Sequence, residues 1–357
     1  MSRFFSKKYA SLVPYTPGEQ PRERKYIKLN TNESPFPPSE KSRRLAAEAA
    51  ERLQLYPDPD CTELTAALAA LCGVEPDEVI LTNGSDEILN FAFMAYCDEE
   101  TPAAFADLTY GFYSVFGEIN QIPYVEIPLK EDFTIDITDY FGLHKTIFIA
   151  NPNAPTGIAL TRAEIEEILK ANPDNVVVID EAYVDFGGET CIPLIKKYDN
   201  LLVAQTFSKS RSMAGARLGF GIGCKSLIQD LNAIKYSTNP YNINRMTMAA
   251  GLGMVQDEEY TQANCAAIME TREWTTKELT RRGFTVLPSR TNFVFAKHRA
   301  VGGADIYTGL KERGILIRHF TKERIKDYNR ITIGTREEME ALMKALDQIE
   351  GITTQAL

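Results

Sequence analysis

A carboxylate and an amine stand at the ends of two apolar segments in the middle of the chain. Residues 176–180 are apolar and β-branched up to the carboxylate of Asp180, and residues 201–207 are largely apolar up to Ser208 and Lys209. Short segments of this composition are typical of buried parallel strands, and ligands bind at the carboxyl ends of such strands in open α/β sheets. The pattern therefore predicts that Asp180 and Lys209 meet at one edge of a sheet.

These two groups suit pyridoxal 5′-phosphate (PLP). PLP needs an amine to form a Schiff base, an acid beside its pyridine nitrogen and donors for its phosphate. Lys209 offers the amine and Asp180 the acid. Thr206, Ser208 and Arg217 offer hydroxyls and a fork-shaped cation to the phosphate. By itself Asp180 is equally a candidate helix cap and Arg217 a candidate for a structural ion pair, but their spacing around Lys209 favours the cofactor roles.

Aromatic and amide side chains nearby suit the ring of the same cofactor. Asn153 lies in the loop Asn-Pro-Asn-Ala-Pro-Thr-Gly, whose prolines and glycine fix its conformation. Its amide is expected to donate to the phenolic oxygen of PLP, beside the hydroxyl of Tyr183. Tyr110 follows a short apolar segment, where its ring either stacks on the cofactor or packs in the core.

A turn before a predicted helix offers a second set of phosphate donors. In Asn-Gly-Ser-Asp, residues 83–86, Gly84 permits a close approach of the backbone. The N–H groups of Ser85 and Asp86 at the helix start favour an anion. Many turns between strands and helices look alike, so this signal gains weight only from its neighbours.

The elements that must position these residues alternate along the chain. We expect strands at residues 78–82, 103–106, 145–150, 176–180 and 201–207, and helices at 39–55, 61–72, 87–96, 111–120 and 161–170. Ser39 is the expected N-cap of the first helix, and Thr161 with Glu164 forms a capping box. Alternation of this kind predicts a doubly wound, mostly parallel α/β sheet.

Composition divides the chain into three parts. Residues 1–38 are rich in proline and charge, which predicts an extended N-terminal arm that joins the small domain. Residues 39–255 carry the alternating pattern and predict the large PLP-binding domain. A long polar helix at 257–282 and short strands after it predict a small α+β C-terminal domain, residues 256–357.

Charge and composition exclude several classes of partner. The net charge of −10 argues against nucleic acid and anionic membranes. Apolar runs fall short of the roughly 18 residues of a membrane span, and the first residues lack a secretory apolar core. The cysteines include no Cys-x-x-Cys pair and only 3 histidines accompany them, which argues against a metal site. We therefore expect a cytoplasmic protein with reduced thiols and no metal.

Several of these segments also carry a resemblance to a known family. They are Leu-Asn-Thr-Asn-Glu-Ser-Pro (29–35), Tyr-Pro-Asp (56–58), Asn-Ala-Pro-Thr-Gly (153–157), Asp-Glu-Ala-Tyr (180–183), Ser-Lys (208–209) and Ala-Gly-Ala-Arg-Leu-Gly (214–219). With them the chain resembles the fold-type I PLP-dependent aminotransferases nearly end to end, and among these the branch that acts on histidinol phosphate.

The resemblance implies transamination between histidinol phosphate and 2-oxoglutarate, which in the biosynthetic direction uses imidazole-acetol phosphate and glutamate for histidine biosynthesis. It implies that Lys209 carries the cofactor and shuttles a proton, with Tyr110 over the face of the cofactor ring. It also implies a homodimer with shared active sites, in which Tyr56 reaches the cofactor phosphate of the neighbouring site. The side chains implied for the anionic end of the substrate are those of Tyr15, Asn153, Arg318 and Arg330.

Three other interpretations remain open at this point. An aromatic amino-acid aminotransferase would share every cofactor residue, and a threonine-phosphate decarboxylase would share the fold and most motifs. The arm Pro-Tyr-Thr-Pro-Gly, residues 14–18, favours the aminotransferase over the decarboxylase. The third interpretation is a binding module without catalysis, and the intact Lys209 and Asp180 argue against it.

Overall fold

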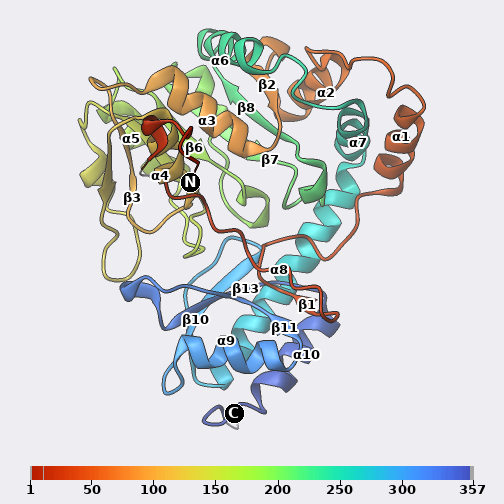
Figure 1. The fold of residues 1–357 in the computed structure, drawn as a ribbon, viewed down its shortest axis with the longest axis vertical. Coiled ribbons are helices and arrows are strands. Elements are labelled where there is room, and N and C mark those ends of the chain that lie inside the picture. Colours follow the sequence, from red (N-terminus) through yellow and green to blue (C-terminus); the bar gives the residue numbers. More distant parts are fainter. Residues whose placement is uncertain (1, 11, 354–357) are drawn as a thin grey trace.

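The computed structural model describes residues 2–10 and 12–353, and a doubly wound α/β sheet forms its larger part (Figure 1). Within this described part, the larger sheet is seven-stranded. In sheet order its strands are β2 (Val79–Thr82), β8 (Gly219–Gly223), β7 (Leu201–Thr206), β6 (Val177–Asp180), β5 (Thr146–Ala150), β3 (Ala103–Ala106) and β4 (Tyr124–Ile127). All neighbouring pairs from β7 to β4 are parallel, and β8 runs antiparallel to both β2 and β7. The prediction of a mostly parallel sheet is therefore confirmed.

Helices cover both faces of this sheet. On one face lie α3 (Ser85–Tyr96), α4 (Phe112–Asn120) and α6 (Lys225–Thr238), and on the other α2 (Thr62–Cys72) and α5 (Arg162–Ala171). In β6, Val178 packs under the first group while Val177 and Ile179 pack under the second. Burial on both faces explains why the central strands are continuously apolar.

A second, antiparallel sheet forms the lower body in Figure 1. In sheet order its strands are β12 (Arg318–His319), β13 (Tyr328–Thr332), β10 (Phe293–His298) and β9 (Phe284–Val286). The helices that share its core are α8 (Glu258–Arg281), α9 (Gly303–Glu312) and α10 (Arg336–Leu346). Helix α8 runs from the upper body into the lower one and joins the two.

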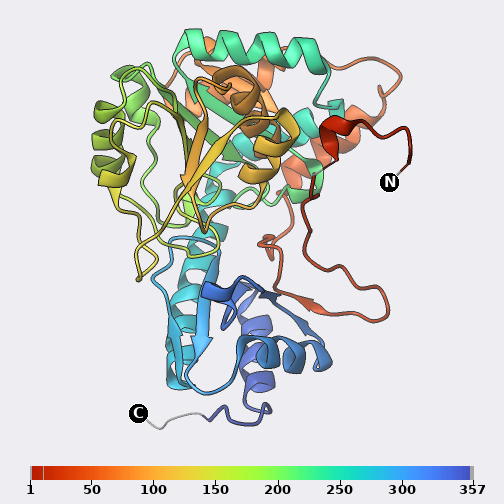
Figure 2. The same cartoon turned by 60° about the vertical axis from the view of Figure 1, so that its left-hand side comes forward.

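Residues 12–38, before α1 (Glu40–Ala50), form an extended segment that touches both bodies (Figure 2). Its short strand β1 (Ile27–Lys28) pairs in parallel with β11 (Ile315–Leu316). Earlier in the same segment, the ring of Tyr15 stacks on Phe112 of α4, with 4.3 Å between the ring centroids. The segment thus lies against both the small sheet and the helices of the large one.

Several local predictions are confirmed and others need correction. Ser39 caps α1 by accepting a hydrogen bond from the backbone of Ser42, and the capping box of Thr161 and Glu164 is present. Helix α1 ends at Ala50, and turns replace the last part of the predicted helix 39–55. The sequence reasoning missed β4, β8, β9, α6 and α7 (Arg245–Val255), which packs on α1. In the residues that the structure describes, none of the helices is long and apolar enough to cross a membrane.

Candidate active site

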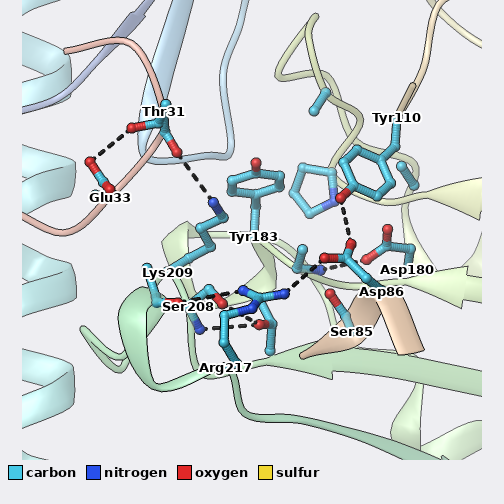
Figure 3. Close-up of a pocket in the computed structure, with 16 residues that line it drawn as sticks. Thr31, Glu33, Ser85, Asp86, Tyr110, Asp180, Tyr183, Ser208, Lys209 and Arg217 are labelled. Carbon is cyan, nitrogen blue, oxygen red and sulfur yellow. Dashed lines mark hydrogen bonds and ion pairs between the residues drawn. The ribbon is translucent and has the colours of Figure 1, made fainter. Parts of the chain in front are cut away.

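Two cavities that share lining residues lie at the carboxyl ends of β5, β6 and β7. The inner pocket has a volume of about 270 Å³ and is drawn in Figure 3. The outer pocket has a volume of about 760 Å³ and extends toward the small sheet. Lys209 and Tyr183 line both pockets. Of the residues predicted to hold the cofactor, those that line the inner pocket are Ser85, Asp86, Tyr110, Asp180, Tyr183, Thr206, Ser208, Lys209 and Arg217.

Lys209 points its amine into this space from the turn that follows β7. Its Nζ donates a hydrogen bond to the backbone carbonyl of Thr31, at 3.4 Å, and lies 5.8 Å from the centre of the Tyr183 ring. Thr31 belongs to the extended segment before α1, so a part of the chain far away in the sequence closes over the amine. The amine takes part in none of the ion pairs of the described residues, which leaves it available for chemistry.

Asp180 is a buried acid at the end of β6, with only 4 % of its surface exposed. It accepts hydrogen bonds from the hydroxyl of Tyr113 and the backbone of Ala182, each at 3.1 Å. Burial raises the pKa of its carboxyl to about 6, although these two hydrogen bonds oppose the shift. The described residues place no ion-pair partner on it. A buried carboxylate without a cation suits the protonated pyridine nitrogen of PLP.

The raised pKa predicts a pH dependence of stability for the cofactor-free protein. The pKa of Asp180 is higher in the folded protein than in the unfolded chain, so the protonated carboxyl contributes to the stability of the fold. This contribution is complete below about pH 4 and is lost as the pH rises through about 6. Asp180→Asn removes this titration. Its free energy of unfolding, relative to the unmodified protein, should rise by up to about 3 kcal/mol across that window. Denaturant unfolding of both proteins at several pH values measures the difference, and parallel pH profiles would contradict the assignment.

In another part of the inner pocket wall, Arg217 reaches the first turn of α3. Its Nη2 donates to a carboxylate oxygen of Asp86 at 2.9 Å. Gly84 has a φ of +78°, and a Cβ atom there would lie 2.5 Å from the same Nη2 atom. Glycine therefore lets the guanidinium lie beside the first turn of α3, so that Arg217 and the N–H groups at the helix start can face the same anion.

Hydroxyl groups complete this part of the pocket wall. The side chains of Thr206 and Ser208 lie 3.0 Å apart, oxygen to oxygen. Tyr110 donates to the second carboxylate oxygen of Asp86 at 2.5 Å, and burial together with this carboxylate raises the pKa of the Tyr110 hydroxyl well above its usual range. A cation, two hydroxyls and a helix N-terminus form a donor set that fits a phosphate. With Lys209 and Asp180, the pocket fits PLP as a whole.

The structure does not bring the amide of Asn153 into the inner pocket. Its Nδ2 donates to the carbonyl of Leu108 and to the hydroxyl of Thr156, both at 3.0 Å, while its Oδ1 accepts from Thr109. These bonds turn the side chain toward a neighbouring cavity, and Ala154 lines the inner pocket in its place. The predicted bond from Asn153 to the cofactor therefore has no support in the geometry.

The hydroxyl of Tyr183 instead receives an amide from another part of the chain. Asn32 donates to it from Nδ2 at 2.9 Å. Residues 29–35 carry part of the family resemblance, but their sequence predicts no role for Asn32. The available signal was a short polar run directly before Pro35, Asn-Thr-Asn-Glu-Ser at residues 30–34.

Two arginines lie in the outer pocket together with Tyr15. Arg330 is half-buried and donates to the carbonyl of Asn30 at 3.2 Å, while its buried Nε has no hydrogen-bond partner. Arg318 donates to two carbonyls of the extended segment, at 3.3 and 3.4 Å. Neither guanidinium belongs to an ion pair within the described ranges. Burial lowers the pKa of Arg330, because the charged guanidinium is less well solvated there than in water. A bound anion would offset this loss of solvation.

Tyr56 lies outside both pockets of its own chain. Its side chain is 78 % exposed, and its ring stacks on Tyr241 with 4.6 Å between centroids. In the part of the chain that the structure describes, no contact joins Tyr56 to a predicted cofactor residue.

The chain is similar to known proteins over nearly its whole length. Residues 24–346 match the family model described as aminotransferase class I and II. The histidinol-phosphate aminotransferase of Marinomonas sp. is 52 % identical over 97 % of this chain and 99 % of its own, and that of Brachyspira hyodysenteriae is 49 % identical over 98 % and 99 %.

Solved structures share the fold at lower identity. The Sinorhizobium meliloti histidinol-phosphate aminotransferase, in complex with pyridoxal-5′-phosphate, has a TM-score of 0.88 at 23 % identity and 98 % coverage of both chains. The L-threonine-O-3-phosphate decarboxylase of Porphyromonas gingivalis has a TM-score of 0.76 at 23 % identity, over 90 % of this chain and 98 % of its own. Fold similarity alone therefore does not separate a transferase from a lyase.

Proposed function

Because the chain belongs to the class I and II aminotransferases, we propose that it transfers an amino group between histidinol phosphate and 2-oxoglutarate, with PLP as its cofactor, in histidine biosynthesis. In the biosynthetic direction the substrates are imidazole-acetol phosphate and glutamate. The observation that carries the substrate assignment is the pair of arginines without acid partners in the outer pocket. Two guanidiniums suit the dianionic phosphate of such a substrate.

The proposed roles follow from where each group lies. Bound PLP supplies an aldehyde that joins an amine and a ring that withdraws electrons. Asp180 holds a proton at the pyridine nitrogen, and Arg217, the two hydroxyls and the start of α3 hold the phosphate. Arg318, Arg330 and Tyr15 hold the substrate's phosphate. Once its Nζ is free, Lys209 removes the proton from the substrate Cα as a general base.

We also propose that the enzyme is a homodimer with shared active sites. Tyr56 is exposed, and other exposed apolar side chains gather near it in the sequence, among them Leu53 and Leu55, which are 55 % and 56 % exposed. A second copy would cover this surface and bring Tyr56 to the cofactor phosphate of the neighbouring site. Light scattering that gives the mass of one chain would contradict the proposal.

The six free cysteines support a location in the reducing cytoplasm.

An absorbance titration of the PLP-loaded protein tests the substrate assignment. Histidinol phosphate, phenylalanine and threonine phosphate are added separately, without a keto acid. We expect histidinol phosphate to convert the visible band to that of the aminated cofactor, and the other two to change it little. Conversion by phenylalanine at similar concentrations would favour an aromatic aminotransferase. Release of carbon dioxide from threonine phosphate would favour the lyase.

A further inference from the structure

Three consecutive residues of the extended segment each touch one functional side chain. The carbonyl of Asn30 accepts from Arg330, the carbonyl of Thr31 accepts from Lys209, and the amide of Asn32 donates to Tyr183. Figure 3 shows Thr31 above Lys209, with the Tyr183 ring beside the amine. Resting on the proposed function, we propose that Asn32 is a positioning residue: it directs the hydroxyl proton of Tyr183 into the inner pocket.

Asn32 is held in one orientation. Its exposed fraction is 1 %, and its backbone N–H donates to the hydroxyl oxygen of Thr332 at 3.0 Å. The Thr332 hydroxyl returns its own proton to Asn32 Oδ1, at 3.1 Å. Since Oδ1 is the atom that accepts this proton, Nδ2 is the atom that faces Tyr183. The backbone φ of 55° lies in the left-handed region, which asparagine tolerates better than most residues.

The consequence for Tyr183 follows from its hydrogen-bond inventory. Its oxygen accepts from Asn32 at 2.9 Å, and among the described residues no acceptor takes its proton. The Tyr183 ring packs edge-on against Phe293, with 5.2 Å between centroids, which fixes the ring. The hydroxyl proton is therefore free to donate toward the ring oxygen of PLP. An amide that donates to the same hydroxyl polarises it and strengthens that bond.

Among the described residues that line the inner pocket, none carries a side-chain amide that could take this role. The loop with Asn153 presents Pro152 and Ala154 to the inner pocket, and neither side chain offers a donor. Because Thr332 lies two residues from Arg330 on β13, both face the same side of that strand. Through Asn32, the hydrogen bonds with Thr332 therefore connect the Tyr183 hydroxyl to β13, the strand that carries Arg330 of the proposed substrate site.

The test is a pH titration of the visible absorbance of the PLP-loaded protein. Its midpoint reports a proton shared between Lys209 Nζ and the ring oxygen, and a donor on that oxygen lowers the midpoint. Asn32→Asp keeps the shape of the side chain and the oxygen that accepts from Thr332. Its second carboxylate oxygen replaces the amide nitrogen, accepts the Tyr183 proton and so directs it away from the inner pocket. We expect a midpoint about half a unit to one unit higher, as for Tyr183→Phe. In the Tyr183→Phe background, Asn32→Asp should add nothing.

Controls separate this proposal from its premise. Asn153→Ala removes an amide of the same kind and should leave the midpoint at the wild-type value. Asn32→Gly, which suits the positive φ, is the second variant if the aspartate protein does not fold; it removes the polarising amide without adding an acceptor, so a smaller rise in the same direction is expected. An unchanged midpoint, or an equal shift in the Tyr183→Phe background, would overturn the role of Asn32. If the unmodified protein gains no visible band with PLP, the proposed function itself fails.

Discussion

Lys209→Ala should lower kcat by about 10⁴-fold, the upper range for loss of a general acid–base group, while the protein still binds its substrate. Lys209 carries both proposed steps, the attachment of the cofactor and the removal of the Cα proton, so no neighbour replaces it. Steady-state rates with histidinol phosphate and 2-oxoglutarate measure the loss. Substrate binding is followed separately by the change in the cofactor spectrum.

Two controls make this result specific to the amine. Lys225→Ala removes an exposed lysine that pairs with Asp77 on the surface, and it should leave the rate unchanged. Small primary amines in solution should partly restore the Lys209→Ala enzyme, because the truncated side chain leaves room for them. Turnover by the Lys209→Ala protein near the wild-type rate would contradict the catalytic role of Lys209, whereas ligand binding without turnover by the unmodified protein would support the binding module without catalysis.

Arg330→Ala should raise the KM for histidinol phosphate by about tenfold to a hundredfold, which corresponds to the loss of a charge-assisted hydrogen bond of about 1.5–3 kcal/mol. Among the described residues the guanidinium has no acid partner: it donates to the carbonyl of Asn30 and lies 5.3 and 5.9 Å from the ring centres of Phe293 and Phe320. A carbonyl and aromatic faces stabilise this charge less than an anion does, so the substrate phosphate is expected to bind strongly here. Arg330→Lys should recover part of the affinity, since an ammonium keeps the charge but loses the fork geometry.

The matched substrate for this variant is histidinol, which lacks the phosphate. If Arg330 binds the phosphate, the variant and the unmodified enzyme should differ little with histidinol. Equal losses with both substrates would show a general defect, and a loss confined to phenylalanine would reject the histidinol-phosphate assignment. Arg330→Met should keep or raise the thermal midpoint of the free protein, because a half-buried cation without an acid partner is removed.

The sequence predicted those parts of the fold and site that depend on local patterns. Continuous apolar strands ending in Asp180 and Thr206 placed an acid, an amine and hydroxyls at one sheet edge, and the parallel register of β6 and β7 confirms the arrangement. Capping at Ser39 and Thr161 was readable because it involves residues only three apart. The roles of these side chains toward PLP stay predictions.

What the sequence could not provide depends on contacts between distant segments. The direction of the Asn153 side chain is decided by Leu108 and Thr109, which no local pattern links to its loop. Strand β8, with its Gly-Phe-Gly-Ile-Gly sequence, was missed because three glycines weaken a strand signal. The glycine at 219 is needed since a Cβ there would lie 2.4 Å from the Gly84 backbone.

The pairing of β1 with β11 also sets the order in which the molecule is completed during its synthesis. Arg24, just before β1, bonds to the carbonyl of Glu312, 288 positions further along the chain. At ribosomal rates of about 5–20 residues per second, the early segment waits roughly 15–60 s for this partner. The strands of the large sheet emerge within that interval. The scaffold can therefore close first, and the segment that contacts Lys209, Tyr183 and Arg330 docks afterwards, so that each chain completes its own part of the site late in its folding.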